Sequence, residues 1–254
     1  VTHDLEKSVS NLPVQRVADY QAMSDVAAEI VTAAVTANPE LVLALPTGST
    51  PLGMFKALIA NVDAGTLDLS RVQFFCLDEY VGVAPDDPDS LTGWLFRSFM
   101  DPAGVPRENI HTVPSSAADP RAALAGYEAE LAALGGLDLA VLGLGPNGHI
   151  AYNEPGSPAD SRSRVLQLTQ QSIDQATAYW APGTPTPTTA MTMGVQTLLE
   201  AKRIVLIVSG AAKAEKLRQT LEDTPSADVP ASWLQLVPEK TLVIADEASA
   251  ANLS

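Results

Sequence analysis

Apolar residues along this chain fall into short continuous runs that alternate with longer stretches of helical spacing. Residues 19–37 are rich in alanine, and their apolar positions recur with the period of about 3.6 residues that defines one face of a helix. The run LVLALP at 41–46 follows, and it predicts a buried strand that ends in a turn. This pair begins a regular alternation of helices and strands.

The alternation continues to the end of the chain. Further strands are predicted over residues 72–77, 137–145, 203–210 and 241–246, and helices near 89–100, near 119–134 and over 211–222. The strand segments are apolar without polar alternation, which is typical of a sheet covered on both faces. We expect an α/β fold: a single three-layer α/β/α domain over residues 1–254, with a doubly wound, mainly parallel, Rossmann-like sheet and an irregular N-terminal segment at 1–16.

Composition places the chain among soluble globular proteins. Its 254 residues are 46% hydrophobic and 18% charged, and no apolar run approaches the roughly 20 residues that cross a bilayer. The N-terminus lacks the basic-then-apolar order of a secretory signal, so a cytoplasmic location is expected. The single cysteine, Cys76, lies in the strand-like VQFFCL and is expected to be a small core residue in a reducing compartment.

The formal charge of −15 excludes some classes of partner. A surface for nucleic acid or an anionic membrane needs clustered Lys and Arg, which this chain does not offer. A phosphorylated small molecule remains compatible, provided that backbone amides and one or two cations bind it locally. The Pro- and Thr-rich segment 181–190 is expected to be a connecting loop or a lid.

Polar loops follow four of the predicted strands. In an open parallel sheet, ligands bind beyond the carboxyl ends of the strands, so these loops are expected to converge on one crevice. The four loops are PTGSTP (46–51), DEYVG (78–82), GPNGHIAYNEP (145–155) and SGAAK (209–213).

The first and last of these loops are candidates for binding a phosphate. Pro51 suits the first turn of a helix whose free N–H groups can receive an anion, and the residues before it supply hydroxyls and a flexible backbone. Ordinary N-capping by Ser or Thr is the alternative. Lys213 lies near the first turn of the last predicted helix and either meets the same anion or is simply solvated. The candidate cradle consists of Thr47, Gly48, Ser49 and Thr50.

The second and third loops carry candidate acid–base groups. Asp78 and Glu79 follow an apolar strand, where partial burial beside another carboxylate can raise a pKa toward neutrality; solvated loop acids are the alternative. Residues 143–148 satisfy G-x-G-x-x-G, but the prolines and glycines that follow break helices, so a dinucleotide turn is not favoured. His149 is instead expected to face the crevice, held by Asn147 and Glu154, unless it is a structural loop histidine.

Seven motifs in this order resemble the glucosamine-6-phosphate deaminase family, also called glucosamine-6-phosphate isomerase. They are LPTGSTP, LDEYVG, VPRENIH, GHIAYNEPGSP, SRSR, MTMGVQTLL and WLQLVPEKTLVIADE, and they extend over nearly the whole chain from about residue 17. The resemblance implies conversion of glucosamine 6-phosphate and water to fructose 6-phosphate and ammonia, on a three-layer α/β fold with no redox cofactor and no metal. Some members of the family are hexamers, so a homo-oligomer is compatible with it.

The resemblance also implies roles for the candidate residues. Asp78 would be the base that takes the C2 proton and returns it to C1. His149 would assist the opening of the sugar ring, with Glu154 as its carboxylate partner. Residues 47–50 and Lys213 would bind the sugar phosphate.

The chain departs from the family pattern at several positions. Asn147 stands where many members have Asp, which increases the dependence of His149 on Glu154. Ala178 stands where the family typically has a phosphate-binding Arg, and Leu91 replaces a substrate-facing aromatic residue. The exact amino-sugar phosphate is therefore left open by the sequence.

The family's allosteric residues are matched only in part. Arg164 and Ser157 agree with the pattern, but Leu166 replaces a usual Lys. We expect no activation by N-acetylglucosamine 6-phosphate.

Two other functions are weighed against the deaminase. A 6-phosphogluconolactonase would usually have DER at the second loop and no NEP after the histidine, whereas this chain has Tyr80 and the run 153–155, NEP. A non-catalytic sugar-phosphate sensor of a bacterial regulator is disfavoured because no helix-turn-helix precedes the domain and the three catalytic residues are intact.

Overall fold

A seven-stranded parallel sheet forms the centre of the molecule in the computed structural model, which describes residues 12–177 and 185–254. The strand order is β1-β10-β9-β6-β2-β3-β5, and every pairing is parallel. The core strands are apolar on both faces, as their unbroken hydrophobic runs predict. The strands are β1 (Val14–Val17), β2 (Val42–Leu45), β3 (Gln73–Cys76), β5 (Ile110–His111), β6 (Leu139–Gly143), β9 (Arg203–Val208) and β10 (Thr241–Asp246).

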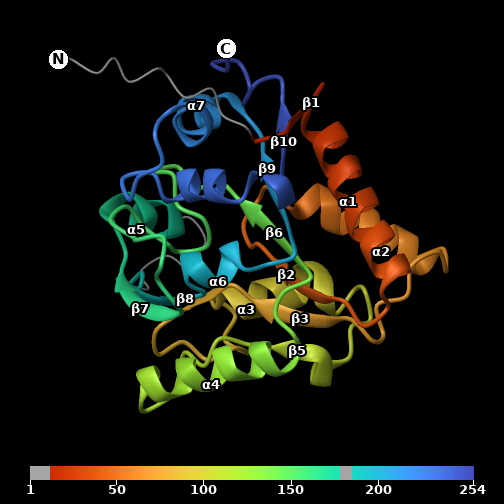
Figure 1. Cartoon of the computed structure of the whole chain (residues 1–254). Coiled ribbons are helices and arrows are strands. Elements are labelled where there is room, and N and C mark those ends of the chain that lie inside the picture. The colour runs from red at the N-terminus through yellow and green to blue at the C-terminus, as the bar shows by residue number, and fades with distance from the viewer. Residues whose placement is uncertain (1–11, 178–184) are drawn as a thin grey trace.

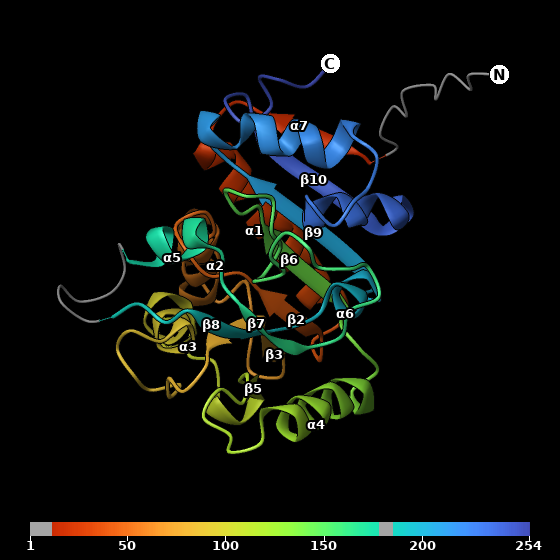
Figure 2. The same cartoon turned by 90° about the vertical axis from the view of Figure 1, so that its left-hand side faces the viewer.

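Helices cover both faces of this sheet. Figures 1 and 2 show α1 and α2 against one face and α6 and α7 against the other. Asp19 caps α1 by accepting the Ala22 N–H at 2.9 Å, which explains where that helix begins. The α/β prediction with a mainly parallel sheet is confirmed. The helices are α1 (Tyr20–Ala37), α2 (Leu52–Asp63), α3 (Leu91–Leu95), α4 (Pro120–Ala133), α5 (Gln170–Thr177), α6 (Val195–Leu199) and α7 (Ala214–Glu222).

A second sheet was not predicted from the sequence. It has three antiparallel strands in the order β4-β8-β7, with β4 at Asp78–Tyr80, β7 at Arg164–Gln167 and β8 at Thr189–Thr192. Only Leu77 separates β3 from β4, so Asp78 and Glu79 lie on a strand rather than in the expected loop. Strands of three or four residues with distant partners leave too short a pattern to detect in sequence.

Three expectations about the ends of elements need correction. Of the segment expected to be irregular over 1–16, residues 1–11 lie outside the described residues, and residues 14–16 belong to β1, an edge strand paired with β10, whose exposed Gln15 and Arg16 interrupt any apolar run. The helix predicted near 89–100 is α3 followed by a π-helical turn at Phe96–Met100. The helix predicted over 211–222 begins with a 3₁₀ turn at Ala211–Lys213 before α7.

Three further expectations concern Cys76, the segment 181–190 and membrane-spanning helices. Cys76 is buried in the core, as predicted. The segment 181–190 falls partly outside the described residues, and its last two residues begin β8, so its role as a lid is a prediction only. Among residues 12–177 and 185–254, no helix has both the length and the apolar character to span a bilayer.

The topology determines where a ligand can bind. From β2 the chain proceeds through α2 to β3 on one side, whereas β6 lies on the other side of β2 and leads toward β9 and β10. The switch point therefore falls between β2 and β6, where a crevice opens at the carboxyl ends of the strands. Polar loops follow the strands β9, β6 and β2 as the sequence predicts, and after the neighbouring β3 the polar residues Asp78 and Glu79 lie on β4 instead.

Candidate active site

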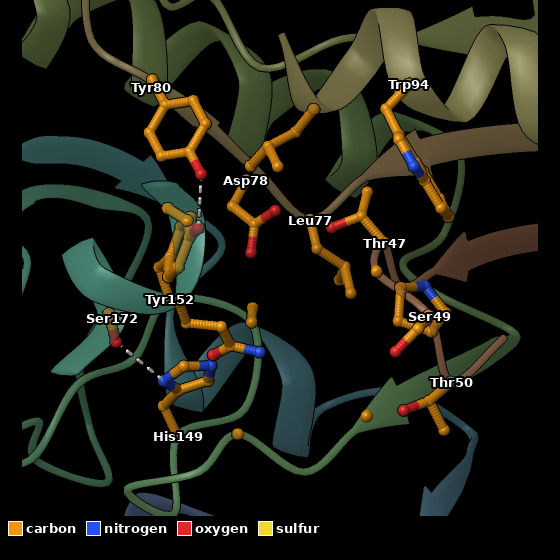
Figure 3. A pocket seen from close by; sticks show the side chains of 18 of the residues that line it. Thr47, Ser49, Thr50, Leu77, Asp78, Tyr80, Trp94, His149, Tyr152 and Ser172 are labelled. Carbon is orange, nitrogen blue, oxygen red and sulfur yellow. Dashed lines mark hydrogen bonds between the residues drawn. The ribbon is translucent and has the colours of Figure 1, made fainter. Parts of the chain in front are cut away.

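A cavity of about 230 Å³ lies at this switch point and is lined by residues from all four loops. Figure 3 shows Asp78 and His149 on one side of it and the hydroxyl residues of the first loop on the other. Asn147 and Glu154 do not line it but are buried behind His149. The candidate site residues that line the cavity are Thr47, Gly48, Ser49, Thr50, Asp78, His149 and Lys213.

The loop after β2 has the features of an anion cradle. Gly48 adopts φ +90°, a left-handed conformation that favours glycine and bends the chain around the cavity. The N-cap of α2 is Pro51, and no side chain caps that helix, so N-capping does not account for the hydroxyls. Within the part of the chain that the structure describes, no hydrogen bond occupies the hydroxyls of Thr47, Ser49 or Thr50, which leaves them available to a ligand.

Tyr20 of α1 fixes this loop from behind. Its hydroxyl donates to the Ser49 carbonyl oxygen at 3.2 Å and accepts from the Gly53 N–H at 2.8 Å. Gly53 lies so close to α1 that an added Cβ would meet Ser24 Oγ at 2.2 Å. The packing of α1 on α2 therefore holds the cradle in place.

Lys213 faces the same cavity from the loop after β9. Burial lowers the pKa of its ammonium group, and none of the described carboxylates forms an ion pair with it. Asp246 at the end of β10 holds the preceding turn, since its carboxylate accepts from Ser209 Oγ and from the Gly210 N–H. A half-buried cation without an anionic partner, opposite free hydroxyls, fits an anionic ligand.

Asp78 projects from β4 into the cavity (Figure 3) and is only 8% exposed. The pKa of Asp78 is raised from 3.8 to about 7. Burial is the main cause, and the neighbouring charge of Glu79 is the second. A carboxylate with a pKa in this range can both accept and return a proton at neutral pH.

His149 is held from behind by a group of buried polar residues. Its Nδ1 lies 3.4 Å from Ser172 Oγ and 3.7 Å from Glu154 Oε2, and its other ring nitrogen lies on the cavity side (Figure 3). Asn147 Nδ2 donates to Glu154 Oε2, and Asn147 Oδ1 accepts the His149 N–H at 3.1 Å. Burial would raise the pKa of Glu154, but His149, Ser172 and Asn147 together lower it to about 2. Glu154 is thus an ionised partner for the imidazole.

The glycines and one alanine of this loop have specific steric roles. An added Cβ on Gly145 would meet the His149 ring at 2.2 Å. Glycine at this position therefore lets the backbone pass close to the histidine ring, and it also lines the cavity. Ala151 is the one described non-glycine residue with positive φ, at 48°. Strain of this kind persists where the surrounding structure imposes it, often at functional sites.

Several cavity residues were not selected from the sequence. Tyr80 and Tyr152 share a hydrogen bond between their hydroxyls at 2.8 Å beside Asp78. Trp94 and Arg97 line the wall formed by α3 and the turn after it, and Ser172 of α5 reaches His149. Tyr80 and Tyr152 lie within motifs quoted above, but nothing in the local sequence marks Ser172 or Arg97.

The structure describes most of the residues that the resemblance implies for substrate contact and for allosteric control. Leu91 does line the cavity, whereas Ala178 lies outside the described residues. Arg164 donates to Asn153 Oδ1 at 2.8 Å and to Ser157 Oγ at 2.6 Å, so the two matched allosteric residues are in contact. The expected lack of allosteric activation stays a prediction.

Metal ligands do not cluster in the described residues. Across 12–177 and 185–254, no group of three or more His, Cys, Asp or Glu side chains could hold an ion.

The fold is of the α/β class, and the cavity at its switch point brings Asp78 and His149 together with Lys213 and residues 47–50. The chain belongs to the family of glucosamine-6-phosphate isomerases and 6-phosphogluconolactonase, whose family model matches residues 15–243.

Relatives extend over almost the whole chain. A glucosamine-6-phosphate deaminase from Thermoanaerobacter pseudethanolicus is 39% identical over 231 residues, covering 91% of each chain. One from Rhodopirellula baltica is 39% identical over 247 residues, covering 96% of this chain and 97% of the relative. The structure of a monomeric glucosamine-6-phosphate deaminase superposes with a TM-score of 0.91 at 34% identity, covering 95% of this chain and 100% of that one.

Lactonases of the family share the fold at lower identity. The 6-phosphogluconolactonase from Trypanosoma brucei has a TM-score of 0.76 and 21% identity, with 96% of this chain and all of that chain covered. This likeness concerns the fold alone.

Proposed function

We propose that the protein is a glucosamine-6-phosphate deaminase that converts glucosamine 6-phosphate and water to fructose 6-phosphate and ammonia. The observation that carries the proposal is the pairing, in one cavity, of Asp78 with a pKa of about 7 and His149 backed by ionised Glu154. The cradle at 47–50 and Lys213 supply donors for a phosphate on the same cavity. Relatives at 39% identity over most of the chain bear the same name.

In the first step the sugar ring opens. The phosphate is bound by residues 47–50 and Lys213, which orients the sugar along the cavity toward His149. His149 donates a proton to the ring oxygen as the C1–O5 bond breaks, and its imidazole then takes the proton of the C1 hydroxyl, so that an aldehyde forms and His149 is restored. Ionised Glu154, held by Asn147, stabilises the imidazole in its working orientation.

In the second step the proton moves between carbons. Asp78 removes the C2 proton, the electrons shift toward the C1 oxygen, and an enediol-like enolamine forms. Asp78 then returns the proton to C1 and an amino proton passes to the C1 oxygen, which leaves a ketose imine at C2. Water adds to the imine and ammonia departs, so the atoms balance without any redox step.

The setting of the reaction is part of the same proposal. The partner is a small phosphorylated sugar, and the buried thiol of Cys76 suits a reducing compartment such as the cytoplasm. A homo-oligomer stays a prediction, and one similar glucosamine-6-phosphate deaminase is monomeric.

The test is an ammonia-release assay on glucosamine 6-phosphate, run beside hydrolysis of the 6-phosphogluconate lactone. Wild type is expected to release ammonia, and Asp78→Asn is expected to release none. Asp174→Asn changes a solvent-exposed residue on α5 and serves as the control, which should release ammonia like wild type. Fast lactone hydrolysis without ammonia would favour the lactonase. Binding of sugar phosphate without turnover would favour the sensor. Ammonia from a different amino-sugar phosphate would correct only the substrate.

A further inference from the structure

Glu79, the neighbour of Asp78 on β4, is completely buried yet does not line the cavity. Successive side chains of a strand point to opposite faces, so Glu79 projects away from the cavity into which Asp78 projects. Its carboxylate accepts three backbone N–H groups, from Tyr80 at 2.9 Å, Leu91 at 3.0 Å and Thr92 at 2.8 Å. Glu79 is therefore a satisfied buried acid, and its position requires an explanation.

Two of the three donors belong to the first turn of α3. N–H groups there have no partner within the helix, so an external acceptor is needed, and Glu79 provides it for Leu91 and Thr92. Leu91 and Trp94 of α3 line the cavity. The Glu79 carboxylate thus joins the strand that carries Asp78 to the helix that forms the cavity wall.

The surroundings of Asp78 and Glu79 affect the pKa values of the two carboxyl groups differently. Burial raises the pKa of both, but three N–H donors stabilise the ionised form of Glu79 and oppose the rise there. These donors keep the pKa of Glu79 from rising as far as burial alone would raise it, and the charge of Glu79 is the second cause that raises the pKa of Asp78. A pair of acids whose surroundings push their titrations apart is a common basis for dividing acid and base roles.

We propose that Glu79 is a positioning residue for the reaction: its buried carboxylate fixes α3 against β4 and places a negative charge beside Asp78, which strengthens Asp78 as a base. This inference rests on the proposed function. A stronger base removes a carbon-bound proton more readily, at the cost of being less ionised below neutral pH.

Other ionisable groups also surround Asp78, and they set the background against which Glu79 acts. Tyr152 and Tyr127 face Asp78 as neutral phenols, because burial raises the pKa of both well above 10. Burial likewise raises the pKa of Cys76 to about 12, so its thiol is neutral. The described charged or ionisable groups that line the cavity, besides Asp78 and the tyrosines, are His149, Lys213, Arg97 and Asp89.

The test compares Glu79→Gln with Ser90→Ala in the pH profile of kcat/KM for ammonia release. Ser90 Oγ caps the same end of α3 by accepting the Gly93 N–H at 2.7 Å, but it carries no charge. Glu79→Gln is expected to shift the acid limb to lower pH by roughly half a unit or more, because a like charge is removed. Ser90→Ala is expected to leave the limb where it is. An unshifted limb in Glu79→Gln, or an equal shift in both variants, overturns the proposal.

A second measurement uses the wild-type protein and does not depend on the folding of Glu79→Gln. Carbon-13 NMR of the side-chain carboxyl groups should show Glu79 ionised at a pH where Asp78 still holds its proton. The opposite order overturns the proposal even if the enzyme is active. If wild type releases no ammonia, the proposed function fails, while this titration still decides the relation between the two acids.

Discussion

The two sheets of this molecule contribute different halves of the candidate site. Loops after β2 and β9 of the parallel sheet carry the cradle at 47–50 and Lys213, all at the surface of the cavity. The small antiparallel sheet carries Asp78 on β4, and it anchors the His149 loop. Tyr152 N–H donates to Thr192 Oγ1 on β8 at 3.0 Å, and Asn153 Nδ2 donates to the Met193 carbonyl oxygen at 2.9 Å.

The two halves of the site differ in the charged and polar groups that they contain and in how far these groups are buried. The parallel sheet presents the hydroxyls of Thr47, Ser49 and Thr50 and one ammonium group, for which the described residues supply no partner, as a binding site for an anion requires. The region around the small sheet buries three carboxylates, those of Asp78, Glu79 and Glu154, and their pKa values move in different directions. We infer that substrate binding belongs to the first region and proton transfer to the second, a division that substitutions can test.

The largest effect is expected from Asp78→Asn. An amide of the same shape cannot accept the C2 proton, so kcat should fall by about 10²- to 10⁴-fold, while KM changes little because the phosphate contacts remain. Steady-state ammonia release measures both constants, and Asp174→Asn serves as the control. A KM that rises as much as kcat falls would mean that Asp78 also contributes to binding, and the division between the two regions would be lost.

The same substitution should stabilise the fold at high pH. Between roughly pH 4 and pH 7 the folded protein keeps a proton on Asp78 that the unfolded chain has lost, so this group makes stability fall as pH rises. Removing the charge should raise the free energy of unfolding by up to about 4 kcal/mol at pH 8 and by little at pH 4. Urea unfolding of Asp78→Asn and wild type at both pH values measures this, and an equal difference at both would contradict it.

Lys213→Ala should act on the other region. Loss of a charge-assisted contact to the phosphate is expected to raise KM by about 10- to 100-fold, with kcat within about threefold. Lys216→Ala is the matched control, because Lys216 lies on α7, does not line the cavity and donates to Gln219. An unchanged KM in Lys213→Ala would remove Lys213 from the phosphate site.

The same two regions differ in how far the sequence predicts them. Strands such as β2 and β9 are continuous apolar runs, and the loops that follow them are recognisable by their glycines and hydroxyls. Asp78, His149 and Glu154 were selected from their motifs, but the sheet that holds Asp78 was not. Its pairings join residues far apart in the chain, such as Asp78 with Thr192, and no local pattern encodes such contacts. Ser172, which reaches His149 from α5, was missed for the same reason.

The smallest effect is expected where the two regions meet, at Ala151. Its φ of 48° turns the chain between His149 and Tyr152, so that both side chains line the cavity. The left-handed conformation costs a non-glycine residue roughly 1 to 2 kcal/mol, whereas glycine adopts it freely but loses more entropy on folding. Ala151→Gly should therefore change the free energy of unfolding by less than about 1 kcal/mol and kcat/KM by less than about threefold. Ala151→Val, which is β-branched, should lose stability and activity together, and equal behaviour of the two variants in urea unfolding would mean that this turn is not strained.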